Sequence, residues 1–216
     1  MRSKILLFLF LLVASASAFA ANPQVEFRTN KGTFVVELYP DKAPKTVANF
    51  LQYVESGFYP GTVFHRTVDR FVIQGGGFTP DMQQKLTMAP VINESNNGLK
   101  NEPGTLAMAR AFDPNSGTSQ FFINLNDNKF LNYYRPDPHY IGYCVFGKVV
   151  RGMDIVESIG KTPTHTAGQF TDVPLEPIVI ENASLLARPV ETAGDGKPST
   201  ASESSKKPAA KGKKSG

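Results

Sequence analysis

Arg66 and Gln74 stand out as residues that could do chemistry, because they lie in a stretch that otherwise predicts a buried strand. The stretch, VFHRTVDRFVIQGGGFT (Val63–Thr79), is rich in aromatic and β-branched residues. A buried cation costs free energy unless a group binds against it. If Asp69-Arg70 forms a turn, two strands pair and both polar side chains face the same side of a hairpin. A guanidinium, an amide and Phe71 would then surround one spot.

Other common catalytic machinery is not indicated. His65, His139 and His165 are not at metal-ligand spacing, so we expect no metal site. There is no G-x-S-x-G nucleophile motif. Cys144 lies in an apolar strand and is expected to be an inert core thiol. The run QGGGF lacks a following G-K-[ST], so it is not a phosphate loop, and we expect no cofactor.

The elements around these residues predict a mainly β fold. Apolar positions in Pro44–Gly57 recur at helical spacing, and Gly152–Gly160 forms a second, shorter helix. The polar stretch 79–103 is expected to be an ordered surface loop. Many short strands with two helices fit a closed antiparallel barrel with helices over its open ends. The expected strands cover residues 25–27, 33–38, 62–67, 71–74, 104–110, 119–125, 144–150 and 176–185.

The two ends of the chain differ from the middle. Arg2 and Lys4 precede the apolar run Ile5–Val13, and small residues flank a cleavage site before Ala21, which predicts a secretory signal peptide at residues 1–20. The alternative, a membrane anchor, would need about 20 apolar residues. Residues 187–216 have almost no large apolar side chains, so we expect a disordered basic tail after a domain at residues 21–186.

The high isoelectric point comes from these ends. The chain carries +4, the tail contributes +4 and the signal peptide +2, so the domain itself carries −2. A nucleic-acid partner for the domain therefore loses its main support. We also expect no stable membrane insertion of the mature protein. The tail could contact anionic membranes or acidic partners, although a solvated spacer is the simpler interpretation.

Three segments resemble the signature blocks of cyclophilins, the cyclosporin-type peptidyl-prolyl isomerases. They are FHRTVDRFVIQGGGFT, NSGTSQFFINL (Asn115–Leu125) and YCVFGKVVRGMDIVESI (Tyr143–Ile159), in the family order. The resemblance extends from Val25 to Leu185 and is greatest to exported bacterial members of the periplasmic type. It implies an eight-stranded antiparallel barrel capped by two α-helices.

The resemblance also implies the site. Catalysis would fall to Arg66, Gln74 and Phe71, with Gln74 holding both Arg66 and the substrate carbonyl. Without the motif, Arg66 would be interpreted as a surface arginine opposite an acidic residue. Residues 109–111 would pair with the substrate backbone. The implied substrate-binding residues are Val72, Ala109, Arg110, Ala111, Gln120, Phe122, Phe130, Leu131 and Tyr143.

Three of these positions depart from the family pattern. Phe130 stands where animal cyclophilins carry a tryptophan, so cyclosporin binding is expected to be weak because an indole donor is lost. Tyr143 stands where many members have histidine, and a tyrosine can still close the pocket. Arg110 stands where family members usually carry asparagine, so only its backbone role carries over.

The expected function is isomerisation of X-Pro bonds in exported, folding proteins, with Arg66 stabilising the twisted amide. The expected partners are proline-containing, unfolded or partly folded polypeptides, and the enzyme is expected to act as a monomer in the periplasm. Secretion or an endoplasmic reticulum lumen are the alternative locations. The alternative function is a binding module or holdase chaperone that uses the same pocket without turnover.

Overall fold

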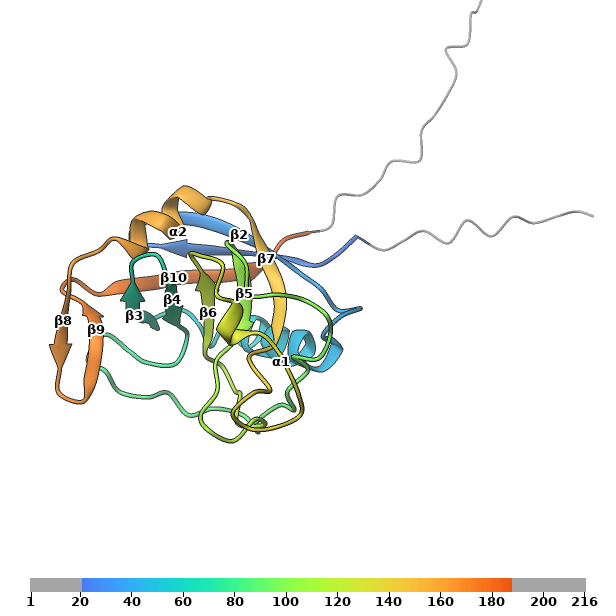
Figure 1. Cartoon of the computed structure of the whole chain (residues 1–216). Coiled ribbons are helices and arrows are strands. Elements are labelled where there is room, and N and C mark those ends of the chain that lie inside the picture. Colours follow the sequence, from blue (N-terminus) through green and yellow to red (C-terminus); the bar gives the residue numbers. More distant parts are fainter. Residues whose placement is uncertain (1–20, 188–216) are drawn as a thin grey trace, which may run out of the picture.

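The computed structural model describes residues 21–187 (Figure 1). The predicted signal peptide and all but the first residue of the predicted tail lie outside this range. Within it, no helix is long and apolar enough to cross a bilayer. The helices are α1 (Pro44–Glu55), α2 (Met153–Gly160) and the short 3₁₀ helix η1 (Lys129–Leu131). The strands are β1 (Gln24–Thr29), β2 (Gly32–Leu38), β3 (Val63–Val68), β4 (Val72–Gly75), β5 (Thr105–Met108), β6 (Phe121–Asn124), β7 (Val145–Arg151), β8 (Thr164–Ala167), β9 (Phe170–Pro174) and β10 (Ile178–Leu185).

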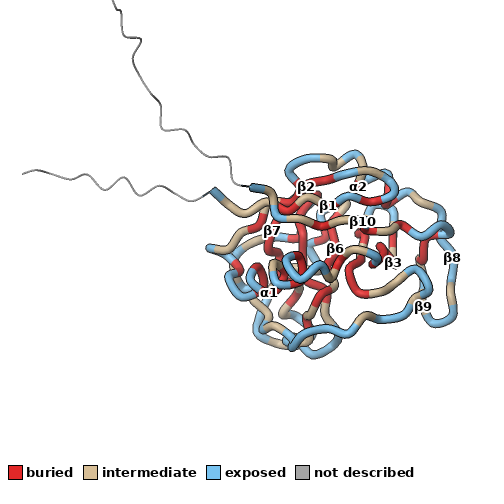
Figure 2. The backbone as a smooth tube through the Cα atoms, turned by 180° about the vertical axis from the view of Figure 1, so that it is seen from behind, coloured by how far each residue is buried: buried red, intermediate tan, exposed pale blue. Residues whose placement is uncertain are grey.

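Eight of the strands close into an antiparallel barrel, as predicted. Their order around the barrel is β1-β10-β3-β4-β6-β5-β7-β2. Closure removes the exposed edges that an open sheet would present to other chains. The most buried segments lie inside the barrel (Figure 2). Side chains from α1 and α2, including Phe50 and Ile159, join the barrel strands in one core cluster.

Strand alternation divides the side chains between two clusters. Successive residues of a strand point to opposite faces of the sheet. On β6, Phe121 and Ile123 belong to the interior cluster, whereas Phe122 between them belongs to a second cluster on the outer face. On β4, Ile73 is interior and Val72 belongs to the outer cluster. The second cluster therefore gives the outer sheet surface an apolar floor.

Helix α1 is capped from a distance. Its N-cap residue, Ala43, offers no side-chain acceptor. Glu94 from the long loop accepts hydrogen bonds from the backbone N–H of Lys45 at 3.2 Å and of Thr46 at 2.8 Å, and from the Thr46 hydroxyl at 2.7 Å. The first N–H groups of a helix have no intrahelical acceptor, and a carboxylate also suits the positive end of the helix dipole. The loop thus supplies the missing cap.

We expect Glu94→Ala to lower the free energy of unfolding by about 1–2 kcal/mol, because it removes the acceptor for two helix N–H groups. Urea unfolding of the variant measures the change. Glu94→Gln keeps an acceptor oxygen and should recover part of the loss. An unchanged unfolding midpoint in Glu94→Ala would show that water replaces the cap without cost.

The structure adds a two-stranded sheet that the sequence patterns did not predict. Strands β8 and β9 pair with each other outside the barrel. All of β8 except its last residue is exposed, so this hairpin lacks the alternation that marks a half-buried strand. Figure 2 shows the hairpin as a largely exposed loop beside the barrel. It contacts β3, the strand that carries Arg66.

Candidate active site

The β3–β4 hairpin brings Arg66 and Gln74 together. Its turn lies at Asp69-Arg70, as predicted, and Arg70 adopts a positive φ of 56° there. Arg66 and Gln74 are direct partners across the two strands. The two side chains therefore share one face of the hairpin, as the sequence predicted.

A β-bulge at His65 sets which face Arg66 occupies. Phe64 pairs with Gly75, and the next pairing is Arg66 with Gln74, so one extra residue lies between them on β3. Without the bulge, Phe64 and Arg66 would face the same side, because side chains alternate. With it, Phe64 points into the core while Arg66 lies outside with Gln74. Bulges commonly redirect a side chain in this way beside active sites.

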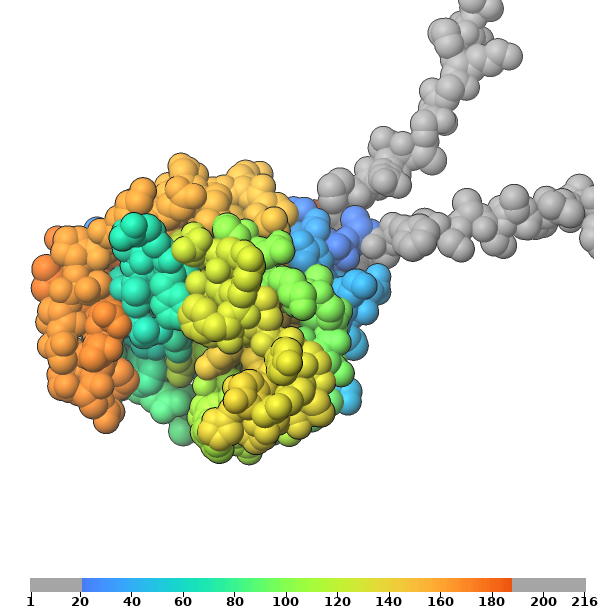
Figure 3. Space-filling view, in the orientation of Figure 1, coloured from blue at the N-terminus to red at the C-terminus, as the bar shows by residue number. Residues whose placement is uncertain are grey.

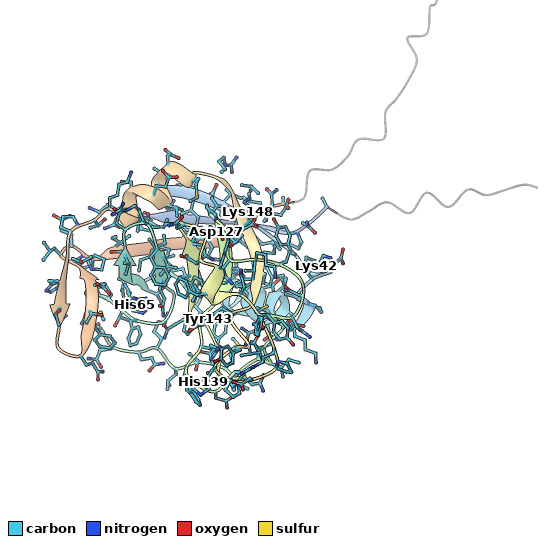
Figure 4. The ribbon with its side chains drawn as sticks, viewed as in Figure 1. Lys42, His65, Asp127, His139, Tyr143 and Lys148 are labelled. Carbon is cyan, nitrogen blue, oxygen red and sulfur yellow. The ribbon has the colours of Figure 1, made fainter. Side chains whose placement is uncertain are left out.

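A pocket opens on the outer face above the second apolar cluster. Figure 3 shows this face, with the β3–β4 segment in teal next to the yellow segments that follow β6. Both Phe122 and Val72 are nearly buried and form its floor. Tyr143, labelled in Figure 4, contributes a wall of the pocket. Its ring lies edge-on to that of Phe122, with ring centroids 5.5 Å apart. The lining residues are Arg66, Phe71, Val72, Gln74, Ala109, Arg110, Phe122, Leu131 and Tyr143.

Arg66 is held from two sides. Its guanidinium carbon lies 5.7 Å from the centre of the Phe71 ring. Its Nε–H donates to Oδ2 of Asp172 on β9 at 3.4 Å. The side chain is 35% exposed, so it remains open to a bound molecule. The cation at the pocket is therefore both solvent-accessible and oriented.

Gln74 makes a different contact from the one expected. Its Nε2 donates to Oε1 of Gln120 at 3.1 Å, whereas the hydrogen-bonded partner of Arg66 is Asp172. The prediction that Gln74 holds Arg66 is thus not what this structure shows. A Cβ at Gly77 would overlap the Gln120 side chain, so glycine at position 77 leaves room for the Gln74–Gln120 pair.

Arg110 ties two segments of the pocket rim together. Strand β5 ends at Met108, two residues earlier than predicted, and residues 109–111 continue as irregular chain. The Arg110 side chain donates to the carbonyl oxygen of Gly142 at 3.0 Å, and its guanidinium carbon lies 4.7 Å from the centre of the Tyr143 ring. Further bonds reach the carbonyls of Ala111, Phe112 and Pro138. The side chain therefore has a structural role that the sequence did not reveal.

Two buried groups near the site have altered acidity. Burial, and secondarily the Arg66 charge, lower the pKa of His65 to about 4, against the opposing effect of a hydrogen bond to the Val63 backbone. Burial raises the pKa of the Cys144 thiol to about 11. Both groups are therefore neutral near pH 7, which suits structural roles. Residues 21–187 contain no cluster of three or more potential metal-ligating side chains.

Comparison with known proteins identifies the family. The family model described as cyclophilin type peptidyl-prolyl cis-trans isomerase/CLD matches residues 24–185. This chain belongs to that family. It is therefore a peptidyl-prolyl cis-trans isomerase, and its barrel is the cyclophilin barrel.

Relatives of this cyclophilin are found among bacteria and eukaryotes. It is 54% identical over 162 residues to peptidyl-prolyl cis-trans isomerase cyp18 of Streptomyces antibioticus, covering 75% of this chain and 98% of the relative. It is 52% identical over 161 residues to peptidyl-prolyl cis-trans isomerase B of Escherichia coli K12, and the match covers 74% of this chain and 98% of that relative. A solved cyclophilin-type isomerase of Cryptosporidium parvum matches with a TM-score of 0.63 at 28% identity, covering 78% of this chain and 99% of that one.

The expected site residues of this cyclophilin fall in three places. Nine of them line the pocket, and Ala111 and Gln120 line an adjoining hollow that also includes Gln84 and Thr118. Phe130 lines neither: it is 75% exposed and stacks on Phe71, with centroids 5.7 Å apart. Asp172 was missed, because it lies about 100 residues from Arg66 in a segment without a strand pattern.

Proposed function

We propose that this pocket is the isomerase active site and that Arg66 stabilises the twisted X-Pro amide. The observation that carries the proposal is the placement of a solvent-accessible guanidinium at the edge of an apolar pocket floored by Val72 and Phe122. The relative from Cryptosporidium parvum was also solved in the presence of the dipeptide Ala-Pro. The proposed substrates are accordingly proline-containing, unfolded or partly folded polypeptides.

The mechanism follows from the electronic structure of the amide. Resonance gives the C–N bond its double-bond character and a rotation barrier of about 18–20 kcal/mol. As the bond twists, the prolyl nitrogen becomes pyramidal and regains its lone pair. A guanidinium aimed at that nitrogen stabilises the twisted state more than the planar ground state, as catalysis requires. Arginine suits this role because it remains protonated and its donors are rigidly arranged.

The remaining lining residues would grip and orient the substrate. Phe122, Leu131 and Tyr143 would hold the pyrrolidine ring while the rest of the chain turns. The backbone of residues 109–111 would hold the substrate main chain, and the Gln74–Gln120 pair would position its carbonyl. No proton leaves and no covalent bond forms, so the reaction requires neither a nucleophile nor a cofactor.

The test is exchange NMR on a short Ala-Pro peptide with a chain comprising residues 21–187. Isomer exchange should accelerate in proportion to enzyme concentration, and Arg66→Ala should abolish the acceleration. The same samples should be assayed for suppression of aggregation of a denatured protein. Intact suppression without any exchange by the wild type would contradict catalysis at this pocket and favour the holdase.

We expect Arg110→Ala to raise the KM for Ala-Pro peptides about 10-fold with a smaller change in kcat. The substitution removes the bonds from Arg110 to Gly142 and Pro138 and frees the Tyr143 wall, whereas Arg66 keeps its own contacts. Arg110→Lys should not rescue the variant, because a single ammonium lacks the fork of a guanidinium. An unchanged KM would show that Tyr143 keeps its place without Arg110.

We also propose that the protein is exported to a periplasm and acts there as a monomer. The basic n-region and the apolar run of the first 13 residues support export. Mass spectrometry of the protein from a fractionated bacterial host tests this proposal. A mature chain that begins at Ala21 in the periplasmic fraction would support it, whereas an intact Met1 end in the cytoplasm would overturn it.

A further inference from the structure

The β8–β9 hairpin lies outside the barrel, and the proposed mechanism does not yet use it. It is anchored to the strand that carries Arg66 by a row of ring contacts. Phe170 on β9 packs edge-on against Phe78, with centroids 5.2 Å apart, and Phe78 packs edge-on against His65 at 4.7 Å. His65 is the bulge residue directly before Arg66. The hairpin is therefore fixed in place relative to the cation.

Asp172 is presented to Arg66 by an unusual backbone. It has a φ of 60°, in the left-handed region, within strand β9. This conformation is uncommon for non-glycine residues, although aspartate and asparagine adopt it more readily than most. Oδ2 of Asp172 accepts the Arg66 Nε–H at 3.4 Å and also accepts the Thr171 hydroxyl at 3.2 Å. The carboxylate is thus itself oriented.

The ion pair contributes little to stability. Both side chains are more than one third exposed, at 35% and 38%, and such pairs are worth little in water. Its geometry is more informative than its energy. Asp172 engages only Nε, which leaves the outer N–H groups of the guanidinium available. With the Phe71 ring on another side, the guanidinium has few orientations left.

We propose that Asp172 is a positioning residue that fixes the orientation of Arg66 for catalysis. Asp172 does not line the pocket, so it acts through Arg66 rather than on the substrate. The inference rests on the proposed role of Arg66. Loss of Asp172 should lower kcat, because the guanidinium would no longer be aligned with the prolyl nitrogen. It should leave KM nearly unchanged, because Phe122 and Leu131 keep their places.

The test compares Asp172→Gly with Asp172→Asn. Glycine removes the carboxylate and tolerates the positive φ, whereas asparagine keeps an acceptor oxygen and also tolerates it. We expect Asp172→Gly to lower kcat about 10-fold at constant KM and Asp172→Asn to retain at least a third of wild-type kcat. Glu181→Gln is the matched control, because Arg28 Nε lies 3.3 Å from Glu181 in a similar pair between β1 and β10.

A double substitution separates failure of this inference from failure of the proposed function. In an Arg66→Ala background, Asp172→Gly should cause no further loss. If Arg66→Ala removes activity but Asp172→Gly stays within twofold of the wild type, the positioning role is overturned and the catalytic role of Arg66 stands. If Arg66→Ala keeps full activity, the proposed function itself is overturned, and the positioning role falls with it.

A measurement on the wild-type protein covers the case in which the glycine variant does not fold. The ¹⁵N–¹H NOE of the Arg66 Nε–H reports how ordered that bond is on the picosecond-to-nanosecond timescale. We expect it to approach backbone values, whereas that of Arg70, whose side chain is 88% exposed, should be much lower. Equal mobility of the two side chains would overturn the inference.

Discussion

Replacing Arg66 with alanine should lower kcat/KM for an Ala-Pro peptide by roughly 100- to 1000-fold, the usual cost of removing one preorganised electrostatic group from a transition state. Most of the loss should appear in kcat, because Phe122 and Leu131 still line the pocket in which the ring is proposed to bind. The fold should persist, since the Arg66 side chain is one third exposed and its ion pair adds little stability. Exchange NMR at saturating and at low peptide concentrations separates kcat from KM.

Two further variants test whether charge alone accounts for the Arg66 effect. Arg66→Lys keeps a positive charge but loses both the Nε–H that donates to Asp172 and the planar fork, so it should recover only a small part of the activity. Arg151→Ala removes another arginine, on β7, that pairs with Glu26 at 3.6 Å and does not line the pocket. That variant should keep wild-type turnover. Full activity in Arg66→Lys would reduce the role of Arg66 to a general positive field.

The sequence predicts the barrel well because alternation and turn signals are local. The turn at Asp69-Arg70 is a local signal that the sequence shows. The pairing of Arg66 with Gln74 also requires Phe71 to lie in the loop, because Val68 pairs with Val72. The eight barrel strands each carry apolar residues that must be buried, so the sequence patterns predicted eight strands, and the family resemblance implied the same number. The nine residues that line the pocket were identified from the family resemblance, and six of them lie in its three signature blocks.

What the sequence did not predict depends on contacts between distant segments. Asp172 reaches Arg66 across 106 residues, and Glu94 caps α1 across 48. In both cases a side chain in an irregular or exposed segment satisfies a donor elsewhere, so neither periodicity nor a local motif marks it. No sequence pattern marks the bulge at His65 either, although the bulge decides that Arg66 faces the pocket rather than the core. Sequence patterns therefore identify the residues that line the pocket better than the residues that contact them from distant segments.

The bulge has a consequence for the dependence of stability on pH. His65 is 6% exposed and its pKa falls to about 4, first because of burial and then because of the Arg66 charge. An unfolded histidine titrates near pH 6.5. Between these two values the unfolded state binds a proton that the folded state does not, so stability falls as the pH falls. The loss should begin near pH 6.5, reach about 3 kcal/mol near pH 4 and then level off.

Urea unfolding of the wild type and of His65→Leu between pH 4 and 7.5 measures this effect. Carboxylates titrate in both proteins, so the difference between the two curves isolates His65, and the absolute packing cost of leucine does not matter. The difference should vary by about 3 kcal/mol across the window and be constant above pH 7. Arg66→Ala should reduce the variation but not remove it, because burial is the larger cause. Parallel curves for the wild type and His65→Leu would mean that His65 protonates equally well in the folded state, and the bulge would then not enclose a neutral imidazole beside the Arg66 guanidinium.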